Sequence, residues 1–339
     1  MDRTGRGAGR GSAHRKPRRA AAHPPDGAVA AAGILSAVLD EQRLIGQGST
    51  VVAAQPTGSA DAGPRRAAVL GSPIAHSLSP ALHGAAYQAL KLTGWRYDIV
   101  ECDEAGLAGF VDGLGPEWVG LSLTMPLKRA VLGIADDVSV LATAVGAANT
   151  LLLGDGRGRS GRRVENTDVA GLVQALREAG LQRVERGVIL GAGGTAQAAL
   201  AALREFGERS PRVLVRDAAR TGDLRAAADR LGVEPVIRGG LPGTRLPEAD
   251  LVVSTLPAGA ADAVSAERWA PGTVALDVVY APWPTPFAAA ATSAGCPVVS
   301  GLAVLLHQAV VQVELMTGRP GPVEVMRSAL DAAVRARQS

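Results

Sequence analysis

The stretch "VILGAGGTAQAAL", residues 188–200, joins a short apolar run to a glycine-rich turn and an alanine-rich segment. Gly191, Gly193 and Ala196 have the spacing G-x-G-x-x-A. In a strand–turn–helix unit, the first glycine permits a tight turn, the second lets a pyrophosphate approach the backbone, and the alanine allows close helix–strand packing. A glycine-rich turn in another α/β fold is the alternative. The stretch predicts a dinucleotide site formed by Gly191, Ala192, Gly193, Gly194 and Thr195.

Strands and helices are expected to alternate along the chain around this turn. Beyond residue 166, short apolar runs are separated by helical segments of about a dozen residues, which predicts βαβ units around a parallel sheet. We expect an α/β protein with an N-terminal α/β substrate domain, a C-terminal Rossmann-type dinucleotide-binding domain and a deep cleft between them. The expected boundaries are 65–166 plus a C-terminal helix at 319–337 for the first domain, and 167–318 for the second.

Capping and turn residues give further local predictions. One helix should have Ser79 as its N-cap and end near Gly94, and another should cover 218–231. The polar stretch 154–163 is expected to be a turn. Residues 1–64 lack sustained periodicity and are rich in Gly, Pro and Ala, so we expect a disordered extension with one marginal helix at 34–45.

Charge and cysteine content restrict the classes of partner. The net charge of +3 comes from residues 1–26, which hold seven basic and two acidic residues, so no basic face for nucleic acid is expected on the folded part. No apolar run approaches the roughly 20 residues that span a bilayer. Cys102 and Cys296 have no paired spacing, which predicts neither a disulfide nor a metal site and favours the reducing cytoplasm. A monomer and a homodimer both fit this sequence.

The end of the strand after the glycine loop decides between the two nicotinamide cofactors. An acidic residue there binds the ribose 2′-hydroxyl of NAD, whereas arginine binds the 2′-phosphate of NADP. The sequence "RVLVRDAAR" places Arg216 and Arg220 four residues apart around Asp217. Two guanidinium groups in this position suit a phosphate, which predicts NADP as the cofactor. Alternatively, both arginines are ordinary surface charges and Asp217 caps the following helix.

Lysine is rare in this chain, since only three of its 35 basic residues are lysines, and one of them is Lys128 in "LTMPLK". Hydride transfer to a carbonyl requires a proton donor for the developing alkoxide, and lysine can act as that donor where arginine cannot. Asp168, at a predicted helix start on the domain boundary, offers a carboxylate partner from the second domain. Lys128 and Asp168 are therefore candidate catalytic residues. The alternative is a solvated lysine and a helix-capping aspartate.

Motifs along most of the chain resemble those of the shikimate dehydrogenase family. They are "LGSPIAHSLSPALH", "LTMPLK", "GAANT", "ENTD", "GAGG", "DVVYAPWPTP" and "GLAVLLHQA", in the family's order and spacing over residues 67–337. The resemblance implies an NADPH-dependent enzyme that reversibly reduces 3-dehydroshikimate to shikimate in the biosynthesis of aromatic amino acids. It also implies Lys128 and Asp168 as the catalytic pair, with no metal.

The resemblance further implies the residues that bind the two ligands. Gly301 matches a backbone position near the nicotinamide. None of the histidines matches the proton donor, and His307 is expected to pack inside the protein. The implied substrate-binding residues are Ser77 and Ser79 for the carboxylate, Thr124 beside them, Asn149 for the substrate hydroxyls, and Tyr280 and Gln308 on the wall of the cleft.

Three positions depart from the family pattern. Ser122 stands where the family usually has asparagine, so one substrate hydrogen bond is either lost or replaced by a hydroxyl. Val169 follows Asp168 where glycine is common, which would tighten the hinge. The usual Asn-Arg-Thr phosphate motif is replaced by residues 215–217, "VRD", which weakens the argument for strict NADP preference.

Two other functions remain open at this point. An NAD-dependent quinate/shikimate dehydrogenase would need space for an additional hydroxyl and an acidic adenosine pocket, and the paired Ser77 and Ser79 and the two arginines disfavour it. A non-catalytic sensor would bind shikimate and dinucleotide without turnover. The presence of Lys128, Asp168 and a complete glycine loop disfavours the sensor.

Overall fold

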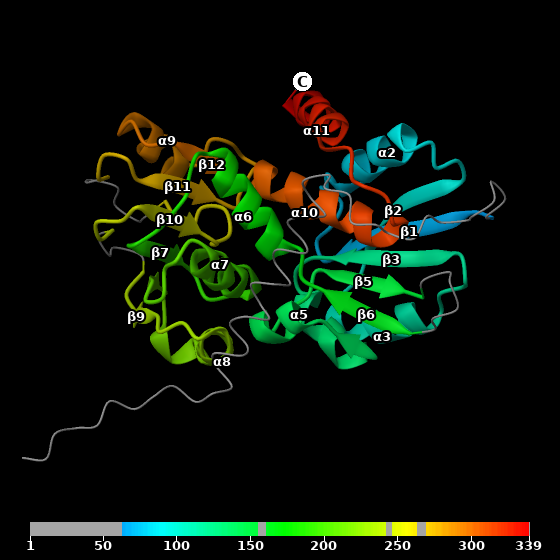
Figure 1. Ribbon diagram of the computed structural model, residues 1–339, viewed down its shortest axis with the longest axis horizontal. Coiled ribbons are helices and arrows are strands. Elements are labelled where there is room, and N and C mark those ends of the chain that lie inside the picture. Colours follow the sequence, from blue (N-terminus) through cyan, green and yellow to red (C-terminus); the bar gives the residue numbers. More distant parts are fainter. Residues whose placement is uncertain (1–62, 155–160, 242–245, 263–268, 339) are drawn as a thin grey trace, which may run out of the picture.

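Two six-stranded sheets lie side by side in the computed structural model, which describes residues 63–154, 161–241, 246–262 and 269–338 (Figure 1). The helix expected at 34–45 lies outside the described residues. Between the sheets, α6 (Asp168–Glu178) packs against α10 (Gly301–Thr317) in the middle of the molecule. The α/β fold with two sheets that the sequence predicts is therefore confirmed.

The first sheet mixes parallel and antiparallel strands. Its strands are β1 (Arg65–Gly71), β2 (Trp95–Glu101), β3 (Trp118–Leu123), β4 (Asp137–Val138), β5 (Thr150–Leu153) and β6 (Arg162–Glu165), in the order β2-β1-β3-β5-β6-β4. β1 pairs in parallel with β2 and β3, whereas β5 is antiparallel to both of its neighbours. β1 and β3 therefore end at the same edge of the sheet, which brings the loops that follow them close together.

Helices from both ends of the chain cover this sheet. The sequence-local helices are α2 (Ser79–Ala89), α3 (Glu104–Asp112), α4 (Leu127–Ala130) and α5 (Val140–Val145), and the last helix is α11 (Val323–Gln338). α11 packs against α2 and α10, with Leu82, Leu306 and Met326 at most 1% exposed at their junction (Figure 1). This small apolar cluster fixes the C-terminal helix over the loop that precedes α2.

The second sheet is entirely parallel. It contains β7 (Gly187–Leu190), β8 (Arg212–Leu214), β9 (Val236–Arg238), β10 (Leu251–Ser254), β11 (Val274–Asp277) and β12 (Val298–Ser300), in the order β12-β11-β10-β7-β8-β9. Counted along the chain from β7, this is the 3-2-1-4-5-6 order of dinucleotide-binding folds, read from the other end. The order reverses between β7 and β10, so the crevice at their carboxyl ends is the expected ligand site.

Small side chains allow the helices of this half to pack closely on the strands. α7 (Gly194–Glu205) reads GTAQAALAALRE, and its alanines are at most 1% exposed. The remaining helices are the short 3₁₀ segment η2 (Ala218–Arg220), α8 (Gly222–Leu231) and α9 (Pro286–Ser293). The core of this half is thus built from Ala, Val and Leu, as the low aromatic content of 3% requires.

Three local predictions are wrong. Residues 162–163, expected in a polar turn, form the start of β6. In this strand Val164 is buried and Arg163 pairs with Glu165. These charged residues hide the alternation of apolar and polar residues that indicates a strand. The segment 218–231 is two helices rather than one, since the Thr221 hydroxyl bonds the Ala218 carbonyl and ends η2.

The third concerns α2, whose N-cap is Leu78 instead of Ser79. It is the Ser77 hydroxyl that accepts a hydrogen bond from the Ser79 backbone N–H, at 3.3 Å. The helix ends at Ala89, well before Gly94, because Lys91 adopts a left-handed conformation with φ of 53°.

Candidate active site

Lys128 and Asp168 meet between the two sheets. Lys128 lies in α4, which follows β3, and Asp168 is the first residue of α6. The Lys128 Nζ is 2.6 Å from the Asp168 Oδ2, and the two side chains are only 20% and 11% exposed. Asp168 is not the N-cap, since Thr167 holds that position. The pair is a charge-assisted hydrogen bond largely shielded from water, rather than a solvated lysine and a capping aspartate.

Asn149 joins this pair from the start of β5. Its Nδ2 donates to the Asp168 Oδ1 at 2.9 Å, and its Oδ1 accepts from the Thr167 backbone N–H at 2.8 Å. Because a backbone N–H can only donate, this contact fixes which end of the amide is oxygen. The Nδ2 also lies 2.9 Å from the Thr167 Oγ1 and 3.1 Å from the Gln308 Oε1. Two amide hydrogens are thus shared among three acceptors.

The start of α10 approaches the loop after β11 very closely. A Cβ on Gly301 would lie 2.0 Å from the Val278 carbonyl oxygen, so only glycine fits there. Tyr280 follows in the same loop and packs on the cluster formed by α2, α10 and α11. Burial raises the pKa of Tyr280, and the nearby Arg337 guanidinium opposes that rise.

Ser77 and Thr124 lie in the adjacent loops after β1 and β3, and Ser79 begins α2 directly after the first of these loops. Ser79 is buried in the first turn of α2, and Ser77 is partly exposed just before it. α11 holds this loop in place, because the Arg337 guanidinium donates to the carbonyls of His76 at 2.8 Å and of Ser77 at 3.0 Å. Nothing in the sequence near Arg337 signals this contact, which depends on the packing of the C-terminal helix.

The structure therefore divides the predicted substrate side into two parts. Lys128, Asp168, Asn149 and Gln308 form one hydrogen-bonded cluster. Ser77, Ser79 and Thr124 follow the neighbouring strands β1 and β3, in their loops or at the start of α2, and Tyr280 comes from the loop after β11 of the second sheet.

The predicted glycine loop connects β7 to α7. Gly191 has φ of 111°, and a Cβ there would lie 2.5 Å from the Thr255 Oγ1, so the turn requires glycine. A Cβ on Gly193 would meet no atom within 4 Å. The N-cap of α7 is Gly193, so no N-cap side chain accepts from the first backbone N–H groups of the helix. These features fit the pyrophosphate of a dinucleotide.

Arg216 and Arg220 are exposed beyond the end of β8. Among the described residues, neither guanidinium has a hydrogen-bond or ion-pair partner. The Asp217 Oδ1 accepts from the Ala219 N–H at 2.8 Å and caps η2. Asp217 is thus engaged in a local turn between the two arginines.

Other polar groups lie outside this arrangement. His307 is buried, with its Nε2 3.0 Å from the Glu178 Oε2 on α6. Cys102 and Cys296 are buried free thiols. In the part of the chain that the structure describes, no group of three His, Cys, Asp or Glu side chains could hold a metal ion. None of the helices described there is long and apolar enough to cross a membrane.

Comparison with known proteins identifies the family. Residues 69–151 match the model of the shikimate dehydrogenase substrate binding domain, and residues 301–330 match that of the shikimate 5′-dehydrogenase C-terminal domain. A shikimate dehydrogenase (NADP(+)) from Moorella thermoacetica is 37% identical over 281 residues, which cover 79% of this chain and 93% of that relative. The chain belongs to the shikimate dehydrogenase family.

Solved structures of the shikimate dehydrogenase family share the fold. The Mycobacterium tuberculosis shikimate dehydrogenase is 44% identical with a TM-score of 0.69, covering 79% of this chain and 99% of that one. The shikimate 5-dehydrogenase of Thermus thermophilus, in complex with NADP(H) and shikimate, is 33% identical with a TM-score of 0.69 and the same coverage.

Proposed function

We propose that this chain is an NADP-dependent shikimate dehydrogenase that interconverts 3-dehydroshikimate and shikimate. The observation that carries the proposal is the Lys128–Asp168 pair at 2.6 Å, held by Asn149 beside the crevice of the dinucleotide-binding sheet. Residues 65–166 with the helix 319–337 would form the substrate domain, and 167–318 the cofactor domain. The relatives and solved structures with these names and ligands support the same reaction.

The proposed reaction transfers a hydride and a proton from two different donors. Bound NADPH, held by the glycine loop, Arg216 and Arg220, would supply the hydride to the carbonyl carbon. Lys128 transfers a proton to the carbonyl oxygen as it becomes an alcohol, which avoids a free alkoxide. Asp168 keeps the ammonium group in place and accepts a hydrogen bond from a substrate hydroxyl. In the reverse direction Lys128 accepts the proton of the same hydroxyl.

The remaining predicted residues position the substrate. The Ser77 and Ser79 hydroxyls bind its carboxylate at the N-terminus of α2, where the helix dipole favours an anion. Thr124 contacts the same region. A substrate hydroxyl takes one of the two Asn149 hydrogens in place of Gln308, which makes the longest of the three contacts. Tyr280 and Gln308 line the wall of the site, and Gly301 lies beside the nicotinamide.

Buried free cysteines fit a reducing compartment, so we place the enzyme in the cytoplasm, as a monomer or homodimer without nucleic-acid or membrane partners.

Initial rates of nicotinamide reduction at alkaline pH test the proposal. The purified protein receives shikimate or quinate, each with NADP or NAD. Fast turnover only with shikimate and NADP is the expected result. Comparable rates with quinate and NAD would instead identify a quinate/shikimate dehydrogenase. Shikimate binding without turnover in any combination would identify a sensor.

A further inference from the structure

A second glutamine on α10 lies behind the proposed substrate site. Gln312 follows Gln308 by four residues, so both amides lie on the same face of the helix, and Gln312 is only 1% exposed. Its Nε2 donates to the Asn149 carbonyl at 3.1 Å and to the Thr150 Oγ1 at 2.9 Å. Its Oε1 accepts from the Ser122 Oγ at 2.7 Å. Gln312 thus bridges the two neighbouring strands β3 and β5.

Backbone contacts fix the direction of every hydrogen bond in this group. The Asn149 carbonyl can only accept, so Gln312 must present its Nε2 there and its Oε1 to Ser122. Ser122 therefore gives its one hydrogen to Gln312, and the Tyr97 hydroxyl, 2.6 Å away, must donate to Ser122. Thr150 accepts from Gln312 and donates its own hydrogen to the Asn149 Oδ1 at 3.1 Å.

Together these bonds form a directed chain. It runs from Tyr97 through Ser122, Gln312 and Thr150 to the Asn149 side chain. The Asn149 Nδ2 in turn donates to Asp168, the partner of Lys128. Ser122, Gln312, Thr150 and Asn149 are each at most 4% exposed, so water does not compete for these bonds.

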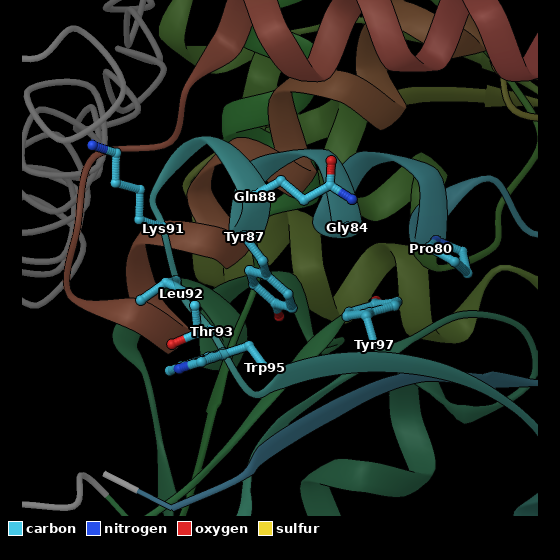
Figure 2. Close-up of a pocket in the computed structure, with 9 residues that line it drawn as sticks. All are labelled: Pro80, Gly84, Tyr87, Gln88, Lys91, Leu92, Thr93, Trp95 and Tyr97. Carbon is cyan, nitrogen blue, oxygen red and sulfur yellow. The ribbon is translucent and has the colours of Figure 1, made fainter. Parts of the chain in front are cut away.

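The outer end of the chain is held by aromatic packing. Tyr97 projects from β2 toward α2, where it forms part of the wall of a pocket of about 360 Å³ (Figure 2). Its ring stacks on that of His83, with ring centroids 3.9 Å apart and planes 15° apart. Burial raises the pKa of Tyr97, and hydrogen bonds with the Ser122 and Ser79 hydroxyls oppose the rise only in part. Tyr97 therefore stays protonated and can donate, as the direction of the chain requires.

We infer that Gln312 is a positioning residue that, with Ser122 and Tyr97, fixes the orientation of Asn149 and Asp168 for the proposed reaction. The inference rests on the proposed function. It also explains the serine at position 122. Because Ser122 has no hydrogen left for a substrate, this position supports the site from behind instead of donating to the ligand.

Loss of the Gln312 amide should loosen the site without unfolding it. The Asn149 carbonyl keeps its bond from the Leu123 N–H at 2.7 Å, but Ser122 and Thr150 each lose the bond to Gln312 and keep only those to Tyr97 and Asn149. The Asn149 Oδ1 keeps its bond from the Thr167 N–H at 2.8 Å, but the Thr150 hydroxyl that also donates to it is no longer oriented by Gln312. A misplacement of about 1 Å can cost on the order of 100-fold in rate, so we expect kcat/KM for shikimate to fall about 10- to 100-fold.

Four variants of the full chain test the inference. Gln312→Leu removes the whole amide, and Gln312→Glu keeps its shape but removes the donor to Thr150 and to the Asn149 carbonyl. Tyr97→Phe leaves the Gln312 amide in place and removes the outermost donor together with the hydrogen bond between Tyr97 and Ser79, so its effect should be the smallest. Glu314→Gln is the matched control, since Glu314 is buried on the same helix but accepts its hydrogen bond from the Gly321 N–H, which is not part of the hydrogen-bond chain.

The expected result is a raised KM for shikimate and a lowered kcat in both Gln312 variants, with the KM for NADP within about twofold of wild type. Kinetics equal to wild type, or a lower melting temperature alone, would overturn the inference. If Gln312→Leu does not fold, Gln312→Glu and Tyr97→Phe decide. If the wild type itself does not turn over shikimate, the proposed function is wrong, whatever the role of Gln312. The stabilisation of wild type and Gln312→Glu by shikimate then tests the positioning role, which predicts a smaller shift in the variant.

Discussion

The two sides of the proposed active site differ in how far they are assembled before a ligand binds. On the substrate side, Lys128, Asp168, Asn149 and Gln312 already hold one another through buried hydrogen bonds. On the cofactor side, Arg216 and Arg220 are exposed and have no partner among the described residues, and Gly193 faces open space.

The difference follows from what each side must do. Proton transfer requires donor and acceptor atoms in fixed positions before the reaction, which rigid, buried contacts provide. A dinucleotide brings its own charge and many contact atoms, so it can order exposed side chains as it binds. We therefore expect substitutions on the substrate side to change kcat most, and those on the cofactor side to change mainly the KM for NADP.

The largest effect should come from Lys128. Lys128→Met removes the proton donor while keeping side-chain volume, and kcat should fall about 10²- to 10⁴-fold, in the range expected for general acid catalysis. The dissociation constant for shikimate, measured by calorimetry, should change far less. Lys91→Met is the control, because Lys91 is exposed just beyond the end of α2 and has no hydrogen bond to the Lys128–Asp168 pair. Turnover by Lys128→Met within threefold of wild type would rule out the proposed donor.

A substitution at Glu314 tests whether changing a buried residue of α10 outside the hydrogen-bond chain affects activity. Burial raises its pKa from 4.5 to about 7, and the bond from the Gly321 N–H opposes the rise. The pKa of Glu314 in the folded state lies above its unfolded value. The contribution of protonated Glu314 to the free energy of folding is therefore fully present below about pH 4.5 and is lost as pH rises through about 7.

Glu314→Gln should remove this pH dependence. Denaturant unfolding at pH 5 should give similar free energies for the variant and wild type. At pH 8.5 the variant should be the more stable by up to about 3 kcal/mol, which is the free energy that corresponds to the rise in the Glu314 pKa from 4.5 to about 7. Turnover should be unchanged at both pH values. A stability difference that is the same at pH 5 and pH 8.5 would contradict this assignment.

The cofactor side should respond to the loss of either arginine. Arg216→Ala and Arg220→Ala should each raise the KM for NADP roughly 10-fold or more, because hydrogen bonds to charged groups contribute about 1.5–3 kcal/mol. The KM for NAD, which lacks the 2′-phosphate, should not rise. Arg225→Ala serves as control, since its guanidinium already bonds the Thr221 hydroxyl. Equal losses with both cofactors would disprove a 2′-phosphate site.

The smallest effect is expected at the exposed ion pair between Arg129 of α4 and Asp223 of α8. This pair joins the two halves next to Lys128, but its side chains are 43% and 68% exposed. Asp223→Asn should therefore cost less than about 1 kcal/mol in the free energy of unfolding, and less still in high salt. A large change in kcat would mean instead that this contact holds the two halves in their reactive arrangement.

Sequence reasoning predicted the second half of the fold more reliably than the first. The parallel strands around Gly191 are short, apolar and separated by clear helical segments, so their pattern alone predicted them. β6 was missed because Arg162 and Arg163 make a buried strand resemble a polar turn. The break after Arg220 was missed because the Thr221 hydroxyl bond that ends η2 has no distinct pattern in the sequence.

For the site, the sequence indicated individual residues but not the contacts among them. Lys128 was notable as one of only three lysines, and Asp168 as a helix start. Gln312 had a weak signal, an amide four residues after Gln308 on an otherwise apolar helix, that could have been used. Tyr97 and Arg337 had none, because their roles depend on how β2 and α11 pack.

The fixed direction of the bond between Ser122 and Gln312 has an evolutionary consequence. The hydroxyl at position 122 donates to the amide oxygen opposite it, and an apolar residue at either position would remove this buried hydrogen bond. The two positions are 190 residues apart in the chain, yet neither can change alone without a penalty. We expect them to covary among homologues, so that lineages with asparagine at position 122 carry a different residue at position 312.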